Sequence, residues 1–295
     1  MSSSLIDDDK PPSKRLRSSF VRRDLQDFPK TQITPGPSSS ECACWTSDAR
    51  SAMQEGYSLV VSDSLTAASV RSLRDSWTSY VHQDQMQYQT VNLTAAKKTL
   101  REVWESSMRI EQGLKNDHDN PVMSWLKSPS ADLLTRQMMD RLEQLKSLAY
   151  AHAHRVRVAR KHVEFKSFIA GVDIMAGGGP CHFDEYDNFA MVLTGMKIFY
   201  HAPPEAFASV QRNEGEYNER LTVNPFDDVT LNRLRSGQPL GKLDTVDRNG
   251  SPLSDRWKMA VLRPGDILLL PHRWWHWVWS EPGTVMVNVW VPRSA

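Results

Sequence analysis

Two histidines and one aspartate could together bind a metal ion. The segment GGGPCHFDEYDNF contains His182 and Asp184, and residues two apart on a β-strand point to the same face. His276 comes much later, in LRPGDILLLPHRWWHWVWS. Two imidazoles and one carboxylate form the facial triad that suits non-haem Fe(II) and leaves coordination positions open, whereas a structural site fills them. If the three side chains meet, the sequence predicts a reactive metal site; a His-x-Asp pair alone is equally typical of a structural hydrogen bond.

Other histidines compete with these candidate ligands. His272 follows Pro271 in a turn, before the strand that contains His276 begins, so we place it at the rim of the site. His152, His154 and His162 belong to the basic segment AHAHRVRVARKH, a composition typical of a solvated face.

Tryptophans alternate with His276 along the chain. On a strand, Trp275, Trp277 and Trp279 would share one face, and His276 and Val278 the other. We expect the indole rings to face outward against a layer of helices, and the imidazole to face inward.

A lysine is a candidate for binding an anion. LTGMKIFYHAPP reads as a strand, a tight turn at Thr194 and Gly195, and a second strand on which Lys197 and Phe199 share a face. An ammonium group inside a barrel is costly unless an anion meets it, and a dicarboxylate co-substrate that also chelates the metal would supply one. Strand alternation alone equally allows Lys197 to face solvent.

An asparagine near the end of the chain raises a similar question. In GTVMVNVWV, Met286, Asn288 and Trp290 share one strand face. An inward Asn288 amide needs hydrogen-bonding partners and could contact a metal-bound carboxylate, whereas on an edge strand it would be wet.

The order of elements predicts the fold that must position these residues. A short strand at 57–61 precedes helical stretches that follow residue 62 and span 93–115 and 130–159. From about residue 163 the chain contains the strand candidates VEFKSFIAGVDIM, NFAMVL, MKIFYHA, KMAVL, DILLLP, HWVWS and VMVNVWV. Helices followed by seven or more strands indicate a mainly β fold, an antiparallel barrel or jelly roll with an N-terminal helical flank.

Composition divides the chain and limits its partners. Residues 1–40 are Ser-, Pro- and Lys/Arg-rich and predict a disordered tail, and 41–295 predict one domain, with the helical flank at about 41–162 and the barrel at about 163–295. The net charge of +1 gives no global field toward nucleic acid, although a local nucleic-acid role stays open.

Three cysteines, no signal sequence and no long apolar run indicate an intracellular protein without a membrane span. The cluster KPPSKRLRSSFVRR, from Lys10 to Arg23, fits either a nuclear-import signal or a solvated basic tail, so both the cytoplasm and the nucleus are compatible compartments.

Taken together, His182-x-Asp184, Lys197 in GMK, PGDILLLPHRWWHWV and the later VNVW resemble the cupin-like JmjC oxygenases. Within this family, the motifs resemble those of the branch that contains the HIF asparaginyl hydroxylase, factor inhibiting HIF. The resemblance covers roughly residues 163–291.

The resemblance implies a double-stranded β-helix that binds Fe(II) and the co-substrate 2-oxoglutarate and reacts with O₂. By motif position it implies iron ligands and co-substrate contacts: His182, Asp184 and His276 for iron, Lys197 for the distal carboxylate, Asn188 and Asn288 for the proximal carboxylate, and Trp290 as an aromatic wall.

Two features depart from the family pattern. The family member used for comparison has a hydroxyl residue three positions before the first histidine, a residue that helps to bind the distal carboxylate. This chain has Gly179 there, which leaves its affinity for 2-oxoglutarate open. The insert at 205–256 has no counterpart, and we expect it to shape the substrate entrance.

The function implied by the resemblance is hydroxylation of a substrate, with release of succinate and CO₂. A protein side chain is the favoured substrate, and a small molecule, a nucleic acid or demethylation stays open. The alternatives are an inactive cupin-fold scaffold and a metal-dependent cupin that does not use 2-oxoglutarate.

Overall fold

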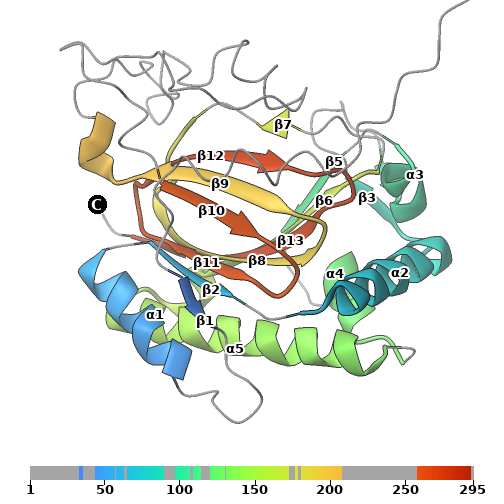
Figure 1. Cartoon of the computed structure of the whole chain (residues 1–295), viewed down its shortest axis with the longest axis horizontal. Helices are drawn as coiled ribbons and strands as arrows, with labels where there is room; N and C mark the ends of the chain where they lie inside the picture. The colour runs from blue at the N-terminus through green and yellow to red at the C-terminus, as the bar shows by residue number, and fades with distance from the viewer. Residues whose placement is uncertain are drawn as a thin grey trace, which may run out of the picture.

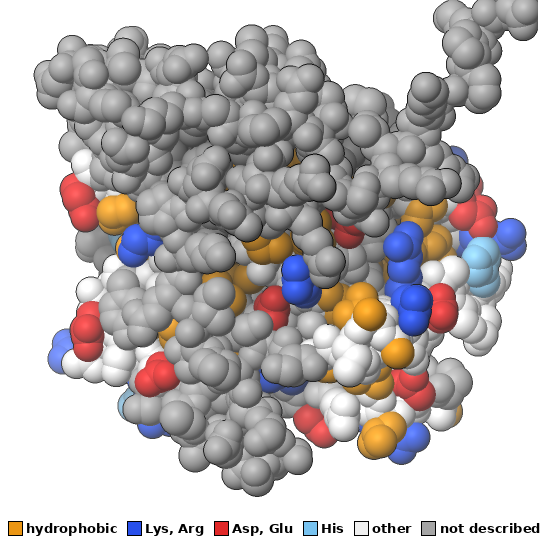
Figure 2. Space-filling view, viewed as in Figure 1, with side chains coloured by type: hydrophobic (Ala, Val, Ile, Leu, Met, Phe, Trp, Pro, Cys, Tyr) orange, Lys and Arg blue, Asp and Glu red, His pale blue; other side chains and the backbone are white. Residues whose placement is uncertain are grey.

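The computed structural model describes residues 33–35, 44–56, 58–62, 65–89, 97–106, 109–113, 120–129, 131–172, 177–178, 181–207 and 258–293. The expected tail at 1–40, apart from one short strand, and most of the 205–256 insert lie outside these residues. Among the described residues, no helix combines the length and the apolarity that a membrane crossing requires. Acidic and basic side chains are interspersed over the described part of the face drawn in Figure 2.

Two facing β-sheets form the centre of the molecule (Figure 1). The larger sheet has the spatial order β1 (Ile33–Pro35), β2 (Leu59–Ser62), β11 (Ile267–Leu270), β8 (Tyr186–Thr194), β13 (Val285–Pro292), β6 (Glu164–Ala170) and β5 (Arg109–Gly113). The smaller has the order β10 (Lys258–Leu262), β9 (Lys197–Ala202), β12 (Trp275–Ser280) and β7 (Gly177–Gly178). Apart from the parallel pair β1–β2, neighbouring strands in both sheets are antiparallel, which confirms the mainly β jelly-roll fold.

Helices cover the outer face of the larger sheet (Figure 1). They are α1 (Cys44–Glu55), α2 (Ala67–Gln83), α3 (Leu100–Trp104), α4 (Pro121–Leu126) and α5 (Leu133–Arg155), with the 3₁₀ turn η4 (Arg160–His162) and a hairpin of β3 (Gln87–Gln89) and β4 (Lys97–Thr99). A second 3₁₀ turn, η5 (Pro204–Phe207), instead follows β9 of the smaller sheet. Side-chain caps begin the two longest helices: Thr66 accepts from the Ser69 N–H, and Asp132 from the Thr135 N–H. Such a cap stabilises a helix by about 1 kcal/mol.

Alternation along each strand creates two separate apolar layers. Phe189, Met191 and Val287 point outward and pack with helix residues such as Trp77 and Leu142. Residues of the opposite parity pack between the two sheets: Val60, Ala190, Val192, Phe199, Ala260, Leu262, Leu268, Leu270, Trp274 and Met286. The site residues must therefore share parity with this second layer to lie inside the barrel.

Every strand candidate after residue 163 forms a strand, but the helix expected at 93–115 is mostly wrong. Among the residues of this range that the structure describes, only Leu100–Trp104 is helical, where Thr99 and Glu102 form a reciprocal capping box. Residues 109–113 instead form β5, which pairs with the edge of β6. Tertiary pairing outweighs the helical propensity of this segment.

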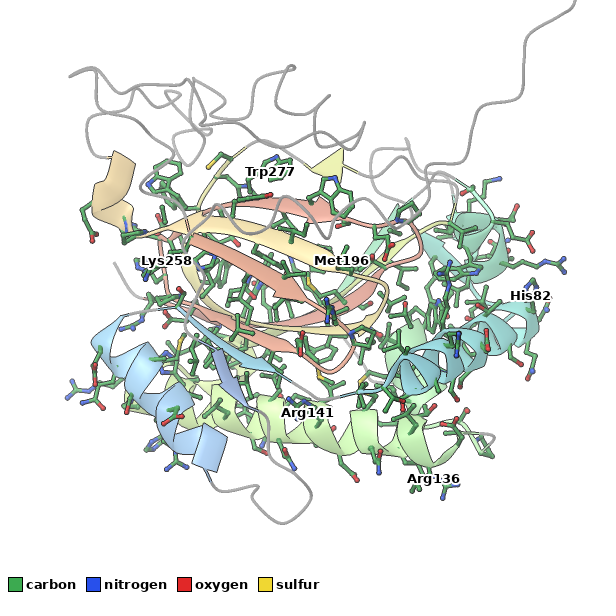
Figure 3. All side chains as sticks on the ribbon, in the orientation of Figure 1. His82, Arg136, Arg141, Met196, Lys258 and Trp277 are labelled. Carbon is green, nitrogen blue, oxygen red and sulfur yellow. The ribbon has the colours of Figure 1, made fainter. Side chains whose placement is uncertain are left out.

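The expected packing of the β12 tryptophans is also wrong. The helices cover the larger sheet, whereas β12 belongs to the smaller one, and Figure 3 shows Trp277 on the side away from the helices. Trp275 packs edge-to-face on Phe183 with ring centroids 4.9 Å apart, and Trp277 lies 5.4 Å from Tyr200. The predicted alternation along β12 is confirmed, because these indole rings face away from the barrel interior.

Candidate metal centre

His182, Asp184 and His276 converge. Their candidate ligand atoms all lie within 4.8 Å of one another. The Nε2 atoms of His182 and His276 lie 3.8 Å and 3.5 Å from the Asp184 carboxylate oxygens. Both distances exceed the range of about 2.7–3.2 Å for a good hydrogen bond, so the structure does not support a plain His–Asp hydrogen bond.

Backbone hydrogen bonds hold the three residues together. The His182 N–H donates to the His276 carbonyl at 3.1 Å, and the His276 N–H to the His182 carbonyl at 2.7 Å. The Asp184 carbonyl accepts from the Arg273 N–H at 3.0 Å. The segment before β8 is therefore tied directly to the start of β12, which brings together residues that are distant in sequence.

The His276 ring has the tautomer that a metal ligand needs. Its Nδ1 donates to the Trp274 carbonyl at 3.0 Å, which leaves the Nε2 lone pair directed toward Asp184. Burial, with repulsion from His182, lowers the pKa of His276 to about 4, although Asp184 acts in the opposite direction. The ring is therefore neutral at pH 7, and a ligand histidine must be neutral.

Lys197 lies inside the barrel. It is 8% exposed, shares the strand face of Phe199, and its Nζ is 5.3 Å from the centre of the Phe168 ring. Of the two orientations that the sequence allowed, the inward one is confirmed.

Two asparagines lie on the inner face of the larger sheet. Asn188 and Asn288 are both buried, and their side-chain amides lie 2.8 Å apart. In the Asn288 orientation that satisfies both ends of its amide, the oxygen accepts from Asn188 Nδ2 at 3.1 Å and from the Trp290 indole N–H at 3.3 Å. The wet edge-strand alternative for Asn288 is wrong, because β13 lies between β8 and β6.

Aromatic rings lie beside this amide pair. Trp290 is half-buried and stacks on Tyr186 with ring centroids 5.1 Å apart. Burial raises the pKa of Tyr186, and the carboxylates of Glu164 and Asp184 add to the shift. Tyr186 therefore lies in the electrostatic field of the candidate ligand Asp184.

His201 is an inner-face residue that the sequence analysis missed. It pairs with His276 across β9 and β12, is fully buried, and forms a 2.9 Å hydrogen bond between its Nε2 and the Ser58 hydroxyl. Burial lowers its pKa to about 3, and the charges of Lys258 and His276 act in the same direction. His201 lies four residues after Lys197 on the same strand, and this spacing could have predicted that both side chains face inward.

The remaining histidines divide between rim and core. His272 is half-exposed and contacts the exposed Glu185 at 2.8 Å, as expected at a rim. His154 and His162 are exposed as expected, but the solvated position expected for His152 is wrong: this ring is buried against Asp187. Gly179 lies outside the described residues.

A family model with the description "Cupin-like domain" matches residues 45–294. Curated relatives include the HSPB1-associated protein 1 homolog of Danio rerio, which is 32% identical over 38% of this chain and 22% of its own, and HSPB1-associated protein 1 of Rattus norvegicus and Homo sapiens, each 29% identical over 38% and 21%. The match thus spans about a fifth of the length of these relatives. The X-ray structure of E. coli ycfD is similar over 52% of this chain and 31% of that chain, with 16% identity and a TM-score of 0.29.

The family model covers the helices from the second residue of α1 onward, both sheets except for β1, and all three candidate ligands. The chain therefore belongs to the Cupin-like domain family.

Proposed function

We propose that the protein is an Fe(II)- and 2-oxoglutarate-dependent dioxygenase that hydroxylates a protein side chain and releases succinate and CO₂. The observation that carries this proposal is the convergence of His182, Asp184 and His276 at the barrel wall. Lys197, buried in the same barrel, is the second support. The likeness of the sequence motifs to the branch of the HIF asparaginyl hydroxylase favours a protein substrate.

The donor set fits iron. Two imidazoles and one carboxylate suit Fe(II) and leave open positions, and His276 is held in the required tautomer. When bound, the metal and the co-substrate supply the oxidative chemistry, in which O₂ and 2-oxoglutarate are converted with the substrate to succinate, CO₂ and a hydroxylated product.

The chain's own residues bind and orient. The Lys197 ammonium pairs with the distal carboxylate of 2-oxoglutarate, and its burial strengthens this pair. Asn188 and Asn288 provide amide groups for the proximal carboxylate. The interior apolar layer around Phe199 and Met286 excludes water from one side.

Succinate release tests the function. Protein purified without oxygen, then given Fe(II), 2-oxoglutarate, a panel of peptides and O₂, should release succinate, and His182→Ala should reduce the release to background. A stable His154→Ala variant is the matched control, because His154 is exposed on α5. Equal release from wild type and His182→Ala would contradict an oxygenase and favour the scaffold alternative, a binding role in keeping with the name of the curated relatives.

Removal of the buried ammonium tests the co-substrate. Lys197→Met should weaken 2-oxoglutarate binding to the Mn(II)-loaded protein by about 30-fold or more, because loss of one partner of a buried charge pair costs about 2 kcal/mol or more. Calorimetric titration measures this affinity, with Lys146→Met on α5 as the control. Unchanged 2-oxoglutarate binding with normal Mn(II) binding would instead indicate a metal-dependent cupin that uses no 2-oxoglutarate.

A further inference from the structure

A cation of the chain itself is held beside Asn288, on the neighbouring strand of the larger sheet. The Lys166 ammonium lies 4.1 Å from the centre of the Trp290 ring and 3.7 Å from the Glu164 carboxylate. The Tyr186 hydroxyl donates to the same carboxylate at 3.3 Å. We name Glu164, Tyr186 and Trp290 the rim cluster.

Strand order explains how the rim cluster forms. β13 lies between β8 and β6, so Trp290 has Tyr186 toward one neighbouring strand and Lys166 toward the other. Glu164 is directly opposite Trp290 in the register of β6 and β13. Trp290 is thus held between a stacked phenol and an ammonium, while remaining half-exposed.

The rim cluster adjoins the site already described. Asn188 opposes Trp290 across β8 and β13, and Asn288 opposes Lys166 across β13 and β6. Tyr186 follows the candidate ligand Asp184 by two residues and begins β8, two residues before Asn188. A substrate group bound at the rim cluster would therefore lie close to the metal ligands.

We propose that the rim cluster is a subsite for a cationic side chain of the substrate, an ammonium or guanidinium group, and that Lys166 occupies this subsite until the substrate displaces it. The inference deepens the proposed function and depends on it for the chemistry that follows binding.

The chemistry of the rim cluster favours a cation over an anion. The face of an indole ring attracts positive charge, and a carboxylate at its edge adds to the attraction. An incoming anion would instead be repelled by Glu164. Displacement of Lys166 is feasible because its side chain is 23% exposed and its flexible stem can return the ammonium to water.

Peptide binding tests the subsite without turnover. The probes are three blocked pentapeptides of glycine with a central lysine, arginine or norleucine, the last being a neutral analogue of similar length. Binding to the Zn(II)-loaded full chain is measured by saturation-transfer NMR at physiological ionic strength. We expect the cationic peptides to bind about two- to fivefold more tightly than the norleucine peptide, as a cation–π contact at a partly exposed site implies.

Three variants and a control decide the outcome. Lys166→Met should increase the preference for the cationic peptides, whereas Glu164→Gln and Trp290→Leu should abolish it. Lys146→Met is the control, because its ammonium also pairs with a carboxylate and lies 5.8 Å from an aromatic ring, but on the helical face. Three outcomes would overturn the proposal. They are equal binding of all three peptides, no peptide binding to either wild type or Lys166→Met, and loss of 2-oxoglutarate binding in Lys166→Met.

The two proposals fail in distinguishable ways. A preference for cationic peptides without succinate release leaves the subsite standing and removes the oxygenase. Succinate release in the absence of a preference removes the subsite alone.

Discussion

Replacement of Asp184 by alanine should lower the affinity of the protein for Mn(II) by at least about 100-fold. Loss of a residue that only hydrogen-bonds a metal ligand lowers metal affinity by about 10- to 100-fold, and loss of a ligand itself should cost more. Asp184 is the only carboxylate of the His182–Asp184–His276 group, and its two oxygens face one imidazole each. Without it, two imidazoles remain to hold a dication with no compensating negative charge.

Electron paramagnetic resonance of Mn(II) measures the affinity. Glu185→Ala is the matched control, because this neighbouring carboxylate is exposed and pairs with Arg273 and His272 outside the group. Its affinity for Mn(II) should stay within a factor of a few of wild type. Wild-type affinity in Asp184→Ala, or an equal loss in Glu185→Ala, would show that the metal binds elsewhere.

The inner face of the barrel was predictable because strands alternate with a period of two. That single rule placed His276 opposite the tryptophans and gave Asn288 and Lys197 a correct inward position among the alternatives. It also applied to His201, which has the parity of Lys197 and is buried against Ser58. The pairing of His182 with His276 needed the structure, because it depends on an isolated bridge between distant segments.

Elements that depend on long-range partners were not predictable from local pattern. β5 has a helical sequence context but completes the edge of β6. The β12 tryptophans alternate correctly, yet which layer they meet depends on which sheet contains β12. His152 lies in a basic segment, and its burial follows from Asp187, which projects from β8 toward α5.

Replacement of Asp187 by alanine should lower the free energy of unfolding by about 3 kcal/mol, because buried donors are left without their acceptor. Asp187 is fully buried and accepts hydrogen bonds from His152 Nε2 at 2.7 Å, from the His272 N–H at 2.8 Å and from Arg293 Nε at 2.6 Å. The Arg155 guanidinium donates to His152 Nδ1 at 2.7 Å, which assigns the proton on Nε2 to the bond with Asp187. Urea unfolding measures the loss, and Asp140→Ala on the exposed side of α5 should change stability by less than about 0.5 kcal/mol.

The same carboxylate should make stability depend on pH. Burial alone would raise the pKa of Asp187, but the hydrogen bonds from His152 and His272 and the charge-assisted bond from Arg293 outweigh it and lower the pKa. The folded state therefore binds a proton on Asp187 less readily than the unfolded state does. The stabilisation from Asp187 is complete above the ordinary aspartate pKa of about 4, and it is lost as the pH falls through the lower pKa of Asp187 in the folded protein. The stability difference between wild type and Asp187→Asn should accordingly shrink below about pH 4; a difference that stays constant from pH 7 to pH 3 would contradict an ionised Asp187.

Because Asp187 also holds the His272 backbone, just before β12, its loss should weaken Mn(II) binding by about tenfold even where the protein remains folded.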